Sequence, residues 1–164
     1  YKNVDYILFF DSDIRFNQDF IPSLLDFNSF GLLPDMYSGV SLTRFLPTDY
    51  NIPAVIYLKG IENSLPDQSG FYRVYDTWSM RATDNVQGGT WKADMQYNPI
   101  SKFYGTFNSV CLIKAEPFKI GARYSHFNKR FNKFDLEHSV LAEQFHCLGY
   151  HDIYINQHLF CFHE

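Results

Sequence analysis

The stretch VDYILFFDSD, residues 4–13, is an almost unbroken apolar run that ends in acidic residues. Continuous apolar runs of this length are typical of strands that are buried on both faces of a mainly parallel sheet. In open α/β sheets, ligands bind beyond the carboxyl ends of such strands. We therefore expect Asp11 and Asp13, directly after the strand, to lie in a crevice at that edge of the sheet.

Other segments of the chain also have clear helical or strand patterns. We predict a short helix over residues 18–27 with Asn17 as its N-cap, and a longer one over 136–148 that ends at Gly149. Its apolar face is Leu136, Val140, Leu141 and Phe145. We predict strands over 37–45, 54–58, 107–113, 152–155 and 159–162, a helical turn at 115–118, and a long irregular binding loop over 62–99. This alternation predicts an α/β fold and a single domain over residues 1–164.

Composition narrows the classes of partner. The chain is 46% hydrophobic and 19% aromatic, which is ample for a packed core, and its net charge of -4 comes from interspersed acidic and basic residues. Nucleic acid is therefore not an expected partner. The longest apolar run is far below the ~20 residues needed to cross a bilayer, so we expect no membrane contact. Because a core-like strand starts within four residues of Tyr1, we expect the chain to be a fragment.

Cysteine and glycosylation patterns bear on the compartment. The three cysteines have no CxxC spacing and are odd in number, which predicts buried thiols rather than a zinc knuckle or a disulfide framework. The sequence also has no Asn-x-Ser/Thr sequon. Both observations favour a reducing, cytoplasmic compartment.

Two carboxylates separated by one residue after a strand can form a hard oxygen site for Mg²⁺ or Mn²⁺. His163, which follows an apolar strand-like segment, could complete the coordination of an ion held by Asp13. Asp135 and Glu137 open the clearest helix and could act as general bases. Each residue has a simpler interpretation: the aspartates cap a loop, His163 is a surface residue, and the acidic first turn complements the helix dipole.

The order of these motifs resembles the GT-A glycosyltransferases. A strand ends in Asp-x-Asp, GTFNSVCLIKAEPF follows at residues 105–118, Glu137 comes twelve residues before Gly149, and a last strand ends in His163. In many of these enzymes a Glu-Asp pair opens the helix, whereas His138 stands here in place of the Asp. The resemblance implies a Rossmann-like, mixed and mainly parallel sheet flanked by helices, without the N-terminal nucleotide-binding strands of a complete domain.

Within that superfamily, residues 71–78, FYRVYDTW, together with Arg81, look like the Tyr-Asp-Thr-Trp-x-x-Arg segment of the fungal capsule-associated mannosyltransferases. The mannan-polymerase subunits of yeasts are more distantly similar. This resemblance implies that Asp76 and Arg81 orient sugar hydroxyls or a diphosphate, that Trp78 is a stacking wall, and that Asn108 contacts the substrate. It also implies a Golgi lumenal location. The simpler interpretation is a local packing and ion-pair cluster.

The resemblance implies a sugar transfer from GDP-mannose or a UDP-sugar to a hydroxyl of a glycan or glycoprotein acceptor. Mn²⁺ (or Mg²⁺) would be held by Asp13 with Asp11 and His163, and Asp11 would also contact the donor. Glu137 would be the base of an inverting reaction, or would position the acceptor in a retaining one. Two rivals stay open: a haloacid-dehalogenase-type phosphohydrolase with Asp11 as nucleophile, and a non-catalytic carbohydrate-binding module.

Overall fold

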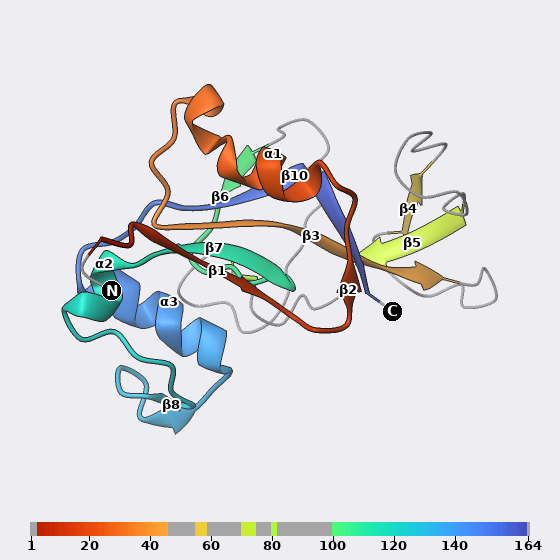
Figure 1. Ribbon diagram of the computed structural model, residues 1–164. Helices are drawn as coiled ribbons and strands as arrows, with labels where there is room; N and C mark the ends of the chain where they lie inside the picture. Colours follow the sequence, from red (N-terminus) through yellow and green to blue (C-terminus); the bar gives the residue numbers. More distant parts are fainter. Residues whose placement is uncertain (1–2, 46–54, 59–69, 75–79, 82–99, 164) are drawn as a thin grey trace.

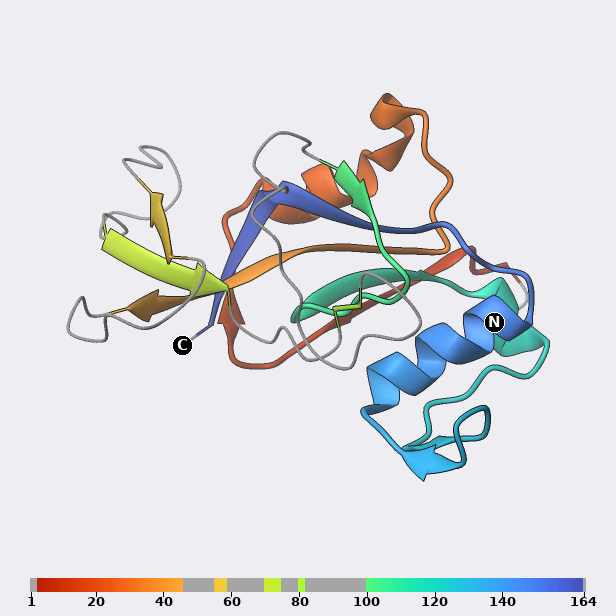
Figure 2. The same cartoon turned by 180° about the vertical axis from the view of Figure 1, so that it is seen from behind.

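The computed structural model describes residues 3–45, 55–58, 70–74, 80–81 and 100–163, and in them a mixed β-sheet lies between helices on both of its faces (Figure 1). Helices α1 (Phe20–Leu25) and η1 (Phe27–Phe30) cover one face. The other face carries α2 (Glu116–Lys119) and α3 (Glu137–Cys147), and the same arrangement is seen from behind in Figure 2. The α/β class predicted from the sequence is thus confirmed.

Two long strands, β3 (Met36–Phe45) and β10 (Ile153–His163), run parallel through the centre of the sheet. Each has shorter partners along its outer edge. Those of β3 are β7 (Val110–Lys114) and β5 (Gly70–Val74), and those of β10 are β6 (Ile100–Lys102) and β2 (Ile14–Arg15). Beyond these, β1 (Tyr6–Phe10) pairs with β7, and β4 (Val55–Leu58) pairs with β5.

The prediction of a mainly parallel sheet is wrong for the described strands. Among them only β3 and β10 are parallel, and every other pairing is antiparallel. The first strand lies at an edge of the described sheet, where β7 is its only partner. Its side chains are only partly buried, and Phe10 is 58% exposed. A run of apolar residues reports burial and not strand direction, so the sequence could not show the antiparallel pairing.

Alternation along the central strands builds two apolar cores. Met36, Val40 and Leu42 of β3 face α3, where they pack with Leu141 and Phe145. Tyr37 points to the opposite face and packs with side chains of α1 and η1, which are Phe20, Leu24 and Phe27. Successive side chains of a strand point to opposite sides, so a single strand supports both helical layers. Figure 1 shows both layers against the sheet.

The helices largely follow the sequence expectations. In α3 the predicted residues Val140, Leu141 and Phe145 are buried, while Leu136 precedes the helix as its N-cap and is 38% exposed. Gly149 follows with a φ of 90°, a conformation that favours glycine. The predicted cap of the first helix is wrong: Asp19 is the N-cap, and Asn17 accepts a hydrogen bond from its amide at 3.2 Å.

The end of the chain forms one strand rather than the two predicted. Its pairing with β3 shifts between Ile155 and Phe160, so β10 carries extra residues there. Gly39 of β3 lies opposite, and a Cβ at Gly39 would stand 2.8 Å from the Leu159 carbonyl oxygen. The absence of a side chain at Gly39 therefore lets the bulged strand approach.

Several short strands of the structure were not predicted from the sequence. A small hairpin of β8 (Phe127–Asn128) and β9 (Lys133–Phe134) stands beside α3. Strand β5 lies inside the stretch expected to be irregular. Two of the cysteines are buried, as expected, but Cys147 is exposed. Among the described residues, no helix has the length and apolarity needed to cross a membrane.

Candidate functional site

The structure brings Asp13 and His163 together at one edge of the sheet. Strand β2 begins one residue after Asp13 and pairs antiparallel with the end of β10, with Ile14 opposite His163. The His163 Nε2 atom lies 3.0 Å from Asp13 Oδ2, and the side chains are 17% and 56% exposed. Asp13 and His163, which are far apart in the sequence, therefore lie close together in the structure as expected. Their role as metal ligands stays a prediction.

The Asp11 side chain does not lie close enough to Asp13 and His163 to form a three-ligand metal site with them in the structure. In the part of the chain that the structure describes, no three His, Cys, Asp or Glu side chains form a group that could hold a metal ion. The Asp11 amide donates a hydrogen bond of 2.9 Å to the Ser109 carbonyl, which fixes the backbone just after β1. The Asp11 carboxylate acts electrostatically on the start of α3, where its charge favours the protonated form of His138.

Glu137, in the first turn of α3, shares that region with two histidines. Its carboxylate lies 3.5 Å from His126 Nδ1 and 4.0 Å from His138 Nε2, and its side chain is 39% exposed. The His138 ring stacks on Phe107, with centroids 3.6 Å apart, and meets Tyr124 edge-on at 5.4 Å. Burial lowers the pKa of His138, and the charges of Glu137 and Asp11 only partly oppose this shift. His138 is therefore neutral near pH 7.

Asp135 and Arg81, expected in separate roles, form a buried ion pair with each other. Arg81 Nη2 lies 2.6 Å from Asp135 Oδ2, with side-chain exposures of 3% and 10%. Burial alone would raise the pKa of Asp135, but the hydrogen bond from Arg81 and the charges of Arg81 and Lys133 lower it overall. Asp135 is thus an ionised carboxylate that is paired with Arg81. A low pKa makes it a weak base.

Glu143 of α3 extends this ion pair into a network. Its Oε1 atom lies 3.9 Å from Arg81 Nη1, and its Oε2 atom accepts hydrogen bonds from Tyr104 at 2.8 Å and Arg130 at 3.1 Å. The Glu143 side chain is only 4% exposed. The network therefore ties α3 to Arg81 and to the segments around Tyr104 and Arg130.

Asn108, expected to contact substrate, is completely buried. Its side-chain oxygen accepts a hydrogen bond from the Ser41 amide of β3. Pairing of β7 with β3 ends at Ser38, and that of β5 starts at Leu42, so Ser41 lies in the gap between the two partners. Asn108 therefore supplies an acceptor that neither strand provides there.

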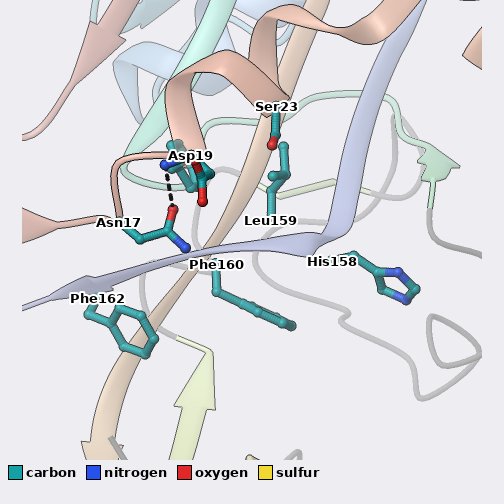
Figure 3. A pocket seen from close by; sticks show the side chains of 8 residues that line it. Asn17, Asp19, Ser23, His158, Leu159, Phe160 and Phe162 are labelled. Atoms are coloured by element: carbon teal, nitrogen blue, oxygen red, sulfur yellow. Dashed lines mark hydrogen bonds between the residues drawn. The ribbon is translucent and has the colours of Figure 1, made fainter. Parts of the chain in front are cut away.

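Residues that are close in sequence to Asp13 and His163 line a small hollow. It lies between the start of α1 and β10 (Figure 3). Its volume is about 170 Å³. Asn17 and Asp19 follow β2, and Phe160 and Phe162 precede His163, so the segments on either side of the pair also line the hollow. Asn17 is held by its hydrogen bond to the Asp19 amide.

Two of the expected substrate-binding residues, Asp76 and Trp78, lie outside the described residues. The sequence analysis also missed several groups that the structure places on α3 or against it. His138 was noted only as a departure from the family pattern, and Tyr124, Phe107 and Glu143 were not singled out. A polar residue with aromatic neighbours in space leaves no periodic signal in the sequence.

A scan against models of known protein families finds no match for this chain, and neither does a search of curated protein sequences. The GT-A resemblance therefore rests on the motifs alone and stays a prediction.

Proposed function

We propose that this chain is the metal- and acceptor-binding portion of a GT-A glycosyltransferase, which transfers a sugar from a nucleoside-diphosphate donor to a hydroxyl of a glycan or glycoprotein. The observation that supports this most is the distance of 3.0 Å between Asp13 Oδ2 and His163 Nε2. The order of motifs required these two residues, 150 positions apart (163 - 13), to meet. The proposed donor is GDP-mannose or a UDP-sugar, as the resemblance implies.

The donor atoms of the pair fit a divalent ion. Neighbouring ligands of an octahedral ion with bonds of about 2.1 Å lie about 3.0 Å apart, which matches the separation of the carboxylate oxygen and the ring nitrogen. Carboxylate and imidazole are both ligands of first-row divalent metals. In this proposal Asp13 and His163 would hold Mn²⁺ (or Mg²⁺), and the ion would supply Lewis-acid stabilisation of the negative charge of a diphosphate. Asp11 would contact the donor, and its part in holding the ion stays a prediction.

Glu137 is the residue we assign to the acceptor hydroxyl. Its side chain is 39% exposed at the start of α3 and is not bound to a cation as closely as Asp135 is. In an inverting reaction Glu137 accepts the hydroxyl proton, and in a retaining reaction it orients the acceptor. Asp135 has a positioning role in this proposal, because its ion pair with Arg81 fixes the entry to α3.

Metal binding tests this proposal directly. We expect the full-length protein to bind Mn²⁺ in isothermal titration calorimetry, and Asp13→Ala or His163→Ala to weaken binding about tenfold or more, as loss of a charged contact does. Asp26→Ala, an exposed carboxylate after α1, is the matched control and leaves binding unchanged. Unaltered Mn²⁺ affinity in both site variants would show that the pair is an ordinary ion pair.

A panel of nucleotide sugars, with and without Mn²⁺, tests the reaction. We expect one donor to raise the melting temperature only when the metal is present, because specific binding stabilises the fold. Hydrolysis of simple phosphate esters without a nucleotide sugar would instead indicate a phosphohydrolase. Binding of free sugar that needs neither metal nor nucleotide would indicate a carbohydrate-binding module.

A further inference from the structure

A second, larger hollow lies between the outer side of α3 and the segment of residues 121–130. Its volume is about 420 Å³, which is within the range of about 300–1,000 Å³ that is usual for small-molecule sites. Glu143 and Gln144 of α3 form one wall, and Phe127 contributes an aromatic ring. None of the site residues discussed so far for sugar transfer lines it.

The lining of this pocket is cationic. Arg123, Lys129 and Arg130 contribute positive charges, and Glu143 is the one carboxylate among the lining residues. The charge of Glu143 is already engaged, because it lies 3.1 Å from Arg130 and 3.9 Å from Arg81. Within the described residues, neither Arg123 nor Lys129 forms an ion pair with a carboxylate. The pocket therefore carries uncompensated positive charge.

Arg123 is held in place without being neutralised. The Gln144 side chain clamps its backbone, accepting a hydrogen bond from the Arg123 amide at 2.9 Å and donating one to its carbonyl at 2.8 Å. The Arg123 guanidinium donates to the carbonyl oxygens of Phe118 and Ala122, both at 2.6 Å. Carbonyl groups orient the guanidinium but leave its full charge for a ligand. A cation fixed before binding loses less conformational entropy when the ligand arrives.

We propose that this pocket binds a small molecule that carries a phosphate or carboxylate group. Guanidinium and ammonium groups bind both kinds of oxyanion, and a guanidinium can do so with two parallel hydrogen bonds. Arg123 and Lys129 contact the oxyanion, and the Phe127 ring, 38% exposed, packs against the body of the ligand. This site is separate from the proposed metal centre and does not depend on sugar transfer.

Titration calorimetry of the full-length protein tests the site with three probes of similar size: glucose 6-phosphate, glucuronate and glucose. We expect saturable binding of one or both anions, weakened by added salt because the contacts are ionic, and no binding of neutral glucose. Binding of a single anion identifies the preferred group. Equal binding of glucose, or no saturation by either anion up to tens of millimolar, would overturn the proposal.

Substitution locates the binding. Lys129→Gln removes one charge from the pocket, and no hydrogen bond or ion pair of its side chain is described, so folding should be unaffected. We expect it to weaken anion binding about tenfold, as loss of a charged contact does. Lys119→Gln makes the same change in α2, outside the pocket, and leaves binding unaltered. Equal effects of both variants would show a general charge effect and refute the assignment.

Discussion

Replacing Arg81 with Met would leave the Asp135 and Glu143 carboxylates without their shared cation. The Arg81 and Asp135 side chains are 3% and 10% exposed, and their charged atoms lie 2.6 Å apart. Removing one partner of a buried pair costs about 3–5 kcal/mol because the other charge stays desolvated. With a shift of roughly 2–4 °C per kcal/mol for domains of about 150–250 residues, the melting temperature should fall by roughly 6–20 °C.

Urea unfolding followed by circular dichroism measures this loss, and the chain offers a matched control. Lys102 and Asp152 form an ion pair of similar length, 2.8 Å, but their side chains are 56% and 53% exposed. Lys102→Met should therefore cost about 1 kcal/mol or less. If Arg81→Met destabilises the protein no more than Lys102→Met, the Arg81–Asp135 pair is not buried in solution and the reasoning is refuted.

The pH dependence provides a second check on the same pair. The pKa of Asp135 is lowered in the folded protein, so its contribution to stability is present above the unfolded value of about 4 and is lost as the pH falls below it. The stability difference between the wild type and Asp135→Asn should therefore narrow in acid. A difference that stays constant down to low pH would contradict the ionised pair.

Three further changes probe the fold. Gly39→Ala should destabilise the protein by about 1–3 kcal/mol, since the new methyl group meets the Leu159 carbonyl; an unchanged urea midpoint would argue against the close approach. Asn108→Ala should cost about 1–3 kcal/mol by leaving the Ser41 amide unpaired, and slowed exchange of that amide would contradict it. The pKa of His138 is lowered in the folded protein, so protonation of this ring favours the unfolded chain and the wild type loses stability between about pH 7 and 5. His138→Phe should lose less stability over the same pH range. An unaltered dependence of the urea midpoint on pH would refute this.

Local patterns in the sequence predicted much of the secondary structure. The apolar run at residues 6–10 is a strand, and the spacing of Val140, Leu141 and Phe145 identified α3 and its buried face. These predictions succeed because burial of one helix face or one strand leaves a regular pattern. The meeting of Asp13 and His163 was expected from the order of motifs in a resembling family and not from periodicity.

Contacts between distant segments could not be derived in the same way. Arg81 and Asp135 each suited a functional interpretation, and nothing in the sequence indicated that they neutralise each other across 54 positions. The antiparallel pairings were missed for a related reason, because strand direction depends on the path of the connecting segments. The role of Asn108 likewise depends on where two strands separate along β3.

The central position of β10 has a consequence for folding. Its parallel partner β3 precedes it by more than a hundred residues. Among the described strands, β6 and β2 pair only with β10. Contacts of such long sequence separation slow folding, because a large loop must close before they stabilise the chain. A complete sheet therefore requires residues 153–163, which bring β6 and β2 into it. The same pairing of β10 with β2 places His163 beside Asp13, so the proposed metal pair exists only where the last strand has joined the sheet.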